Sequence, residues 1–206
     1  MSAKTAILVV DIQNSLATDP GTKIPHAARV CEAGTRILQV ARRIRDTRVR
    51  EQGLPPGFIT VFVQHQESPD EGLLIWGTEP WGLVFEPRQD LVNEEEFVVA
   101  KSVRNAFSNP VLEQILRENG VEDLVIFGIQ SECCVEATCH GAIDTGFAIT
   151  LLSGAHSTYP EPEATPEEIE AQVEARVQAR GATVVRWEAA VEAWEKKGQI
   201  LGPYHQ

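Results

Sequence analysis

Short apolar runs alternate along this chain with longer stretches whose apolar residues recur at helical spacing. The first run, TAILVV at Thr5–Val10, is apolar after its threonine, as is typical of a strand covered on both faces. The segment TPEE at Thr165 combines a capping threonine, a proline at the first helical position and a glutamate three residues after the cap, which predicts the start of a helix. We expect strands at 5–10, 58–63, 97–100, 124–127, 147–152 and 183–185, and helices at 25–50, 110–119, 132–145, 165–181 and 187–197.

This alternation predicts an α/β protein, because parallel strands are joined by helices that cover both faces of the sheet. We expect a three-layer α/β/α sandwich with a mostly parallel, doubly wound six-stranded sheet. The stretch 64–93 lacks a clear period and predicts a long loop over one end of the sheet. The acidic segment 161–174 is expected to be a solvated helix face. A chain of 206 residues fits one domain, 1–206.

The charge balance excludes several partners. Eighteen lysines and arginines against 30 aspartates and glutamates give a net charge of −12, which repels nucleic acid and anionic membranes. No apolar run approaches the roughly 18 residues that span a bilayer. Cys133, Cys134 and Cys139 are too closely spaced for the disulfide framework of a secreted protein. The sequence therefore predicts a cytoplasmic protein without nucleic-acid or membrane partners.

Three reactive side chains stand just after predicted strands. Asp11 follows ILVV, Lys101 follows FVVA, and Cys134 lies just beyond the loop after LVIF. The carboxyl ends of parallel strands meet at one edge, where such sheets bind ligands. Taken singly, the aspartate is more often a turn residue, the lysine solvated and the cysteine a small core residue. Their occurrence together predicts a common site.

Such a site would carry nucleophilic chemistry. Ser131 is a plausible N-cap, which would place Cys134 in the first helical turn, where the helix dipole is expected to lower the thiol pKa. An ammonium would stabilise the thiolate, and a carboxylate could take its proton and hand it to a leaving amine. Nucleophile, base and electrostatic partner would then act without histidine.

Three motif-bearing segments surround these residues: VVDIQNSL at Val9–Leu16, VVAKSVRNAFSNPVL at Val98–Leu112 and FGIQSECCVEATCHGAIDTGF at Phe127–Phe147. Together they resemble the isochorismatase-like cysteine hydrolases, a superfamily that includes nicotinamidases, streptothricin hydrolase and biuret hydrolase. The resemblance covers roughly residues 5–158 in family order. Its most specific motif is a cysteine followed by valine and, four residues on, threonine.

The resemblance implies a catalytic triad of Asp11, Lys101 and Cys134. It favours Cys134 over the adjacent Cys133, because the nucleophile of the family stands immediately before valine. It also implies a cis peptide bond between Ile129 and Gln130, and an oxyanion hole made by the N–H groups of Gln130 and Cys134.

The residues after the second strand depart from the nicotinamidase pattern. Nicotinamidases carry an Asp-x-His metal pair there, whereas Val63–Glu67 reads VQHQE, so we expect no metal and no cofactor. His65 is open to three interpretations: a partner of the cysteine, a lone metal ligand, or a residue that orders the rim of the pocket. His156 is also expected to order the rim. Zinc binding by Cys133, Cys139 and His140 is disfavoured, because these positions cannot share one helix face.

The long loop and the first strand add candidate substrate-binding residues. Trp76 and Trp81 could stack on a flat substrate, or they could pin the loop to the core or to another subunit. Leu16 matches a position where relatives place an apolar pocket residue, and it may equally belong to the core. With His65 and Gln130, these residues complete the predicted binding set.

The predicted function is hydrolysis of a small-molecule amide through a thioester, since true isochorismatases lack the nucleophilic cysteine. Two alternatives stay open: hydrolysis of the isochorismate vinyl ether, and a non-enzymatic thiol redox sensor or binding module. The resemblance also implies a homodimer or homotetramer. A C-terminal helix with Trp187, Val191 and Trp194 on its apolar face is a candidate contact between subunits.

Overall fold

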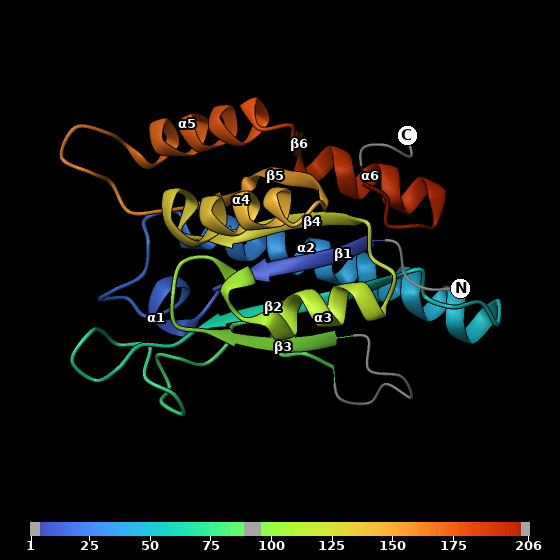
Figure 1. Cartoon of the computed structure of the whole chain (residues 1–206), viewed down its shortest axis with the longest axis horizontal. Coiled ribbons are helices and arrows are strands. Elements are labelled where there is room, and N and C mark those ends of the chain that lie inside the picture. Colours follow the sequence, from blue (N-terminus) through green and yellow to red (C-terminus); the bar gives the residue numbers. More distant parts are fainter. Residues whose placement is uncertain (1–4, 89–95, 203–206) are drawn as a thin grey trace.

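The central element is a fully parallel sheet (Figure 1). The computed structural model describes residues 5–88 and 96–202, and within them six strands pair in the order β3-β2-β1-β4-β5-β6. The end of the predicted long loop, 89–93, lies outside the described residues. The strands are β1 (Thr5–Val10), β2 (Phe58–His65), β3 (Glu96–Lys101), β4 (Asp123–Ile129), β5 (Ala148–Ser157) and β6 (Thr183–Arg186).

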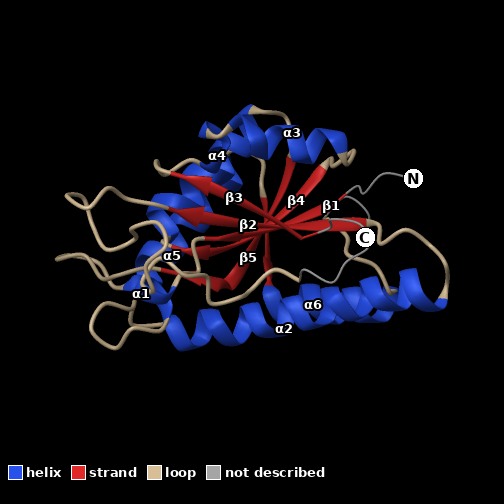
Figure 2. Ribbon diagram, turned by 90° about the horizontal axis from the view of Figure 1, so that it is seen from below, coloured by secondary structure: helices blue, strands red, loops and turns tan. Residues whose placement is uncertain are grey.

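Helices cover both faces of this sheet. Apolar side chains of α3, α4 and α5 pack on one face, and those of α2 and α6 pack on the other (Figure 2). The predicted three-layer α/β/α sandwich is thereby confirmed. None of the helices in the described part of the chain combines the length and apolar character that crossing a bilayer requires. The helices are α1 (Asn14–Ala17), α2 (Ala27–Asp46), α3 (Pro110–Glu118), α4 (Glu136–Asp144), α5 (Pro166–Ala179) and α6 (Trp187–Lys197).

The chain reverses its winding between β1 and β4. The helix after β1, α2, lies on one face, whereas the helix after β4, α4, lies on the other. Open α/β sheets bind ligands at such a reversal, outside the carboxyl ends of the strands. The crevice at the ends of β1 and β4 is therefore where a site is expected.

Strand β5 runs much further than its apolar residues predicted. β5 continues from Leu152 to Ser157, and its register with β4 shifts between Ile126 and Gly128. His156 then pairs beside Gly128. Polar residues thus enter the sheet at this edge, because backbone pairing continues after the apolar run has ended.

Two predictions about exposed helix faces were wrong. The acidic segment is not wholly solvated, since Glu170 on α5 is 8% exposed and accepts a hydrogen bond from Ser157. The apolar face of α6 packs inside this chain, where Val191 and Trp194 are buried and Trp187 packs against the same core cluster. Val191 and Trp194 therefore offer no free surface to another subunit, whereas Trp187 is only partly buried.

Candidate active site

The three predicted catalytic side chains meet at the carboxyl edge of the sheet. Lys101 ends β3, and its Nζ lies 2.6 Å from Asp11 Oδ2 and 3.2 Å from Cys134 Sγ. Asp11, Lys101 and Cys134 are 1%, 4% and 8% exposed. The structure thus joins groups from three separate parts of the sequence around one buried ammonium.

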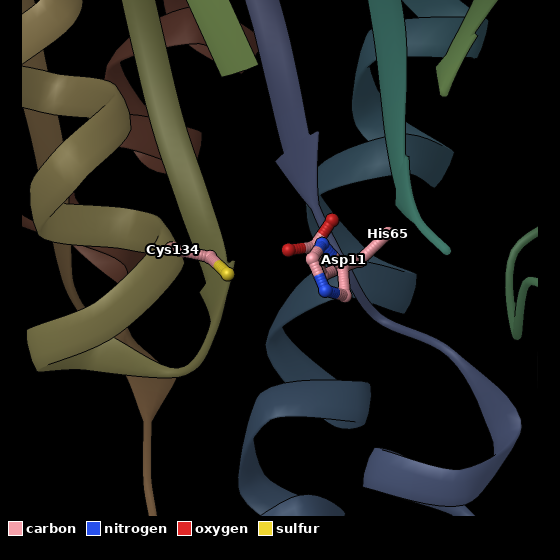
Figure 3. Close-up of side chains that lie close together, drawn as sticks. All are labelled: Asp11, His65 and Cys134. Carbon is pink, nitrogen blue, oxygen red and sulfur yellow. The ribbon is translucent and has the colours of Figure 1, made fainter. Parts of the chain in front are cut away.

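Asp11 occupies an unusual backbone position directly after β1. Its φ is 51°, in the left-handed region that aspartate adopts more readily than most residues. Its backbone N–H still donates to Val63 O, at 3.0 Å, so the residue stays attached to β2 while the chain turns away. The turn directs the carboxylate toward Cys134 (Figure 3).

Gln13, which sequence reasoning missed, fixes the chain after this turn. The side chain is fully buried, donates to the backbone oxygens of His65 and Trp81, and accepts from the His65 N–H. Gln64 donates to the same Trp81 oxygen. The two glutamines tie the end of β2 and the tryptophan loop to β1. A polar residue so close to a buried strand was the available signal.

Lys101 stays charged in this environment. Burial alone would lower its pKa, but the negative charge of Asp11 and the contact with Cys134 outweigh burial and raise the pKa above its ordinary value. The site therefore contains a fixed positive charge beside the thiol.

The two adjacent cysteines, Cys133 and Cys134, shift each other's pKa. The Cys134 thiol donates to Cys133 Sγ at 4.0 Å. This hydrogen bond, with burial and the charge of Asp11, raises the pKa of Cys134 above its ordinary value even though Lys101 acts in the opposite direction. The same hydrogen bond, supported by the charges of Arg104 and Lys101, lowers the pKa of Cys133 to about 7. The pKa of Cys134 is therefore shifted in the direction opposite to the one that the sequence predicted, because burial and the neighbouring thiol act against the charge of Lys101.

The turn that carries Cys134 has the cis peptide bond that the resemblance implies but not the expected cap. A π-helical turn, Ser131–Val135, precedes α4, and the peptide bond between Ile129 and Gln130 is cis. Ser131 is not the N-cap, which is Gln130. The Ser131 hydroxyl instead lies 2.8 Å from His156 Nδ1, because β5 extends beside this turn.

A cavity of about 310 Å³ opens over these groups. The predicted residues Leu16, His65 and Gln130 contribute to its wall. As the described residues define it, the wall includes neither Trp76 nor Trp81, so their predicted contact with substrate is not seen. Sequence reasoning missed two groups of lining residues. Glu67 and Leu74 stand on a loop without a motif, and Ser102, Val103 and Arg104 follow Lys101 inside a motif-bearing segment that gave them no role.

Only one of the two tryptophan positions anchors the loop within the described residues. Trp76 is 72% exposed, and its ring centroid lies 6.3 Å from that of Trp81 at a tilt of 56°. The Trp81 backbone oxygen accepts from both buried glutamines described above. The loop is therefore held through its backbone at Trp81.

His65 lies in the cavity wall, as expected of a rim residue, and contacts Lys101. Its Nδ1 lies 3.1 Å from Lys101 Nζ, and burial together with the Lys101 charge lowers its pKa, so a neutral ring accepts from the ammonium. Donor atoms of Asp11, His65 and Cys134 all lie within 4.8 Å of one another, a set that suits a thiophilic metal (Figure 3). The Lys101 ammonium contacts all three, so a metal would have to displace it.

Comparisons with known proteins agree with this architecture. The family model for the isochorismatase domain matches residues 5–189. A streptothricin hydrolase of Streptomyces noursei is 30% identical over 161 residues, which cover 77% of this chain and 51% of that protein. The chain thus spans about half the length of this relative. A ureidoacrylate amidohydrolase of Methylorubrum extorquens is 26% identical over 181 residues, covering 76% of this chain and 71% of that protein.

The fold likewise matches solved structures. The crystal structure of a cysteine hydrolase from Pseudomonas syringae pv. phaseolicola superposes with a TM-score of 0.78 at 16% identity, covering 94% of this chain and 93% of that one. The matched family model includes nearly the whole sheet and all three side chains of the candidate site. The chain belongs to the isochorismatase family of hydrolases.

Proposed function

We propose that this chain hydrolyses the C–N bond of a small-molecule amide through a thioester on Cys134. The observation that carries the proposal is the buried Lys101 ammonium, which contacts both the Asp11 carboxylate and the Cys134 thiol beside a cavity. A cation shared by an acid and a thiol holds both in place and stabilises the thiolate as it forms.

In the proposed reaction, Asp11 takes the thiol proton as Cys134 Sγ attacks the carbonyl carbon. The new S–C bond pushes the carbonyl electron pair onto oxygen, where we assign stabilisation to the N–H groups of Gln130 and Cys134. Asp11 returns the proton to nitrogen, the C–N bond breaks, and ammonia or an amine leaves. Water, deprotonated by Asp11, then cleaves the thioester and restores the thiol.

The raised pKa of Cys134 supports this order of events. A thiol that stays protonated in the free protein needs a base at the moment of attack, and Asp11 is a carboxylate in the cavity wall beside it. Lys101 stays charged throughout, so it stabilises both the carboxylate and the forming thiolate.

The relatives support the reaction class. One acts on streptothricin, and another is an amidohydrolase of ureidoacrylate. The cavity of about 310 Å³ is of the size that binds small molecules. A small amide, ureide or lactam is therefore the proposed substrate class.

The test begins with a screen for ammonia or amine release from primary amides, ureides and lactams. A slow substrate is then mixed with a Cys133→Ala variant and quenched in acid. The tryptic peptide 118–176 of this variant contains Cys134 and the fully buried Cys139, so fragmentation of the peptide assigns the added mass to one of them. The expected result is added mass equal to the acyl group on Cys134. Hydroxylamine present during turnover should yield a hydroxamate.

Direct water attack on a vinyl ether forms no such adduct, and neither does a redox sensor. Turnover of an amide with neither adduct nor hydroxamate, under single-turnover conditions that resolve them, would contradict the proposal. Failure of every amide in the screen would also count against it.

A further inference from the structure

The end of β5 and the residue that follows it hold the turn before Cys134 through two buried side chains. His156 and Thr158 are both 0% exposed. His156 Nδ1 lies 2.8 Å from the Ser131 hydroxyl, and Thr158 Oγ1 donates to Glu132 Oε1 at 2.9 Å. Two successive residues of the turn before Cys134 are therefore attached to β5.

The other side of the imidazole faces α5. His156 Nε2 lies 3.3 Å from Glu174 Oε1, and this contact is the main cause that lowers the pKa of Glu174. The carboxylate is thus ionised and orients the ring. The Ser131 hydroxyl at Nδ1 and the Glu174 carboxylate near Nε2 together limit the rotation of the imidazole.

A second contact, one helical turn earlier, keeps α5 in place. Glu170 Oε1 accepts from Ser157 Oγ and from Arg29 Nη2, and Arg29 also donates to Gly154 O. The inner face of α5 is thereby attached to β5 independently of His156. The position of Glu174 beside the imidazole is therefore fixed by contacts that do not involve His156.

Close packing of the neighbouring strands limits the other ways in which the turn could be placed. Gly128 pairs beside His156, and a Cβ atom at Gly128 would lie 2.1 Å from Val10 O. The strands that carry Asp11 and the nucleophile turn thus approach closely at this point. Ser131, three residues after Gly128, is the first turn residue held by a side chain of β5.

Serine, histidine and glutamate in this order resemble a hydrolase triad, but their placement argues for another role. Ser131 is 0% exposed and, like His156, lies outside the cavity wall that the described residues form. Neither side chain can contact a substrate in the cavity. Ser131 and His156 can therefore influence the reaction only by positioning Cys134.

We propose that Glu174, His156 and Ser131 form a positioning relay that sets Cys134 Sγ against Lys101 Nζ. Glu174 orients the imidazole, and His156 Nδ1 fixes the Ser131 hydroxyl three residues before the thiol. This inference rests on Cys134 being the nucleophile of the proposed function. A displacement of about 1 Å in a reacting group lowers rates on the order of 100-fold.

Side-chain amides at position 156 can test the two contacts separately. In His156→Asn the amide lies near the place of Nδ1, and in His156→Gln it lies near the place of Nε2. We expect His156→Leu and His156→Gln to lower kcat on the order of 10- to 100-fold with KM little changed, since the cavity wall is untouched. His156→Asn should recover most of the lost kcat, because it restores the contact with Ser131.

A second readout is independent of any substrate. In a Cys133→Ala background, the second-order rate constant for alkylation by chloroacetamide is measured against pH. The modification is read at Cys134 by peptide fragmentation, since Cys31 and Cys139 remain in the variant. His156→Leu should shift this profile and slow the reaction, and His156→Asn should restore it. If neither the wild-type protein nor any variant hydrolyses an amide, the proposed function fails. If the alkylation profiles of Cys134 still change as predicted in that case, the relay is supported.

Matched variants on α5 and in the turn complete the test. Glu174→Gln should lower kcat, whereas Glu167→Gln, on the same helix with a 62% exposed side chain, should not. Ser131→Ala should lower kcat, and the loss should not add to that of His156→Leu, as expected for residues in one chain of contacts. If His156→Leu does not fold, Ser131→Ala and Glu174→Gln carry the test.

Three results would overturn the relay: unchanged kcat and alkylation profiles in Ser131→Ala and His156→Leu, equal loss of kcat in His156→Asn and His156→Leu, or full additivity of the serine and histidine substitutions.

Discussion

The Lys101 ammonium lies 2.6 Å from a carboxylate oxygen of Asp11, and the two side chains are 0% and 1% exposed. Each charge therefore compensates the other in a place that water does not reach. The pair joins the end of β3 to the end of β1, across β2. In the proposed mechanism this arrangement links catalysis to stability, because either single substitution leaves a buried charge without its partner.

We expect Lys101→Met and Asp11→Asn each to abolish turnover and to lower the free energy of unfolding by about 3–5 kcal/mol. The double variant should be inactive yet more stable than either single variant, since neither charge remains. Urea denaturation measures these differences. Lys196→Met, which breaks an exposed pair with Glu192, should not change stability measurably. Equal stability of the single and double variants would contradict this interpretation.

Substitution of Cys133 and of Cys134 should have clearly different effects on turnover. We expect Cys134→Ala to abolish turnover and Cys133→Ala to retain most of it. The first cause of the raised pKa of Cys134 is its hydrogen bond to Cys133, so Cys133→Ala should lower the pKa of Cys134 and move the alkylation profile toward lower pH. Equal loss of activity in both variants, or a profile that moves upward, would contradict the assignment.

The pKa of Cys133 shows whether the side chain at position 134 donates this hydrogen bond. Because donation from Cys134 is the main cause of the low Cys133 pKa, Cys134→Ser retains a donor and should keep that pKa near its present value of about 7. Cys134→Ala lacks a donor, so the pKa of Cys133 should rise toward that of an ordinary thiol. Iodoacetamide labelling at stepped pH distinguishes the two variants. Identical profiles would show that the hydrogen bond has no such effect.

Removing the ammonium should convert the same pocket into a metal site. In Lys101→Ala, the donors of Asp11, His65 and Cys134 would surround free space, and a thiolate with an imidazole favours Zn²⁺ or Co²⁺. We expect Co²⁺ to produce a thiolate charge-transfer band in this variant, and the additional change His65→Ala to abolish it. The wild-type protein should show no band and should keep its activity after prolonged chelation. Activity lost on chelation and restored by a metal would contradict our interpretation of the site.

The cavity wall predicts different roles for two apolar loop residues. Leu16 lines the cavity, whereas Trp76 is 72% exposed on the loop. We expect Leu16→Ala to raise KM several-fold and Trp76→Ala to leave KM and kcat near their original values. Steady-state kinetics on the best substrate of the amide screen measure both. A larger effect at Trp76 would restore the stacking interpretation.

The layers of the fold and the three residues Asp11, Lys101 and Cys134 could be predicted from the sequence alone. Apolar runs alternating with amphipathic stretches predicted the layers, because strands covered on both faces need nearly continuous apolar side chains. Asp11, Lys101 and Cys134 could be found because each directly follows, or lies one loop beyond, such a run. Their convergence depends only on parallel strands ending at one edge, a property of the whole fold.

The features that sequence reasoning missed depend on contacts between distant segments. Ser131 has the residue type and position of an N-cap, yet its hydroxyl binds His156 because β5 extends past its apolar run. The pKa of Cys134 depends on the direction in which the neighbouring thiol points. Gln13 forms three contacts with residues more than 50 positions away. Local pattern and spacing contain none of this information.

The cavity wall has two structurally different parts. One part, with Asp11, Ile129 and Cys134, stands on strand ends and the turn that continues them, and the other, with Leu74, Ser102 and Arg104, stands on connecting loops. Loops tolerate replacement far better than buried strand ends do. Selection can therefore diversify the range of molecules accepted while the bond-breaking apparatus stays unchanged, and directed evolution toward new substrates should concentrate its libraries on the loop half.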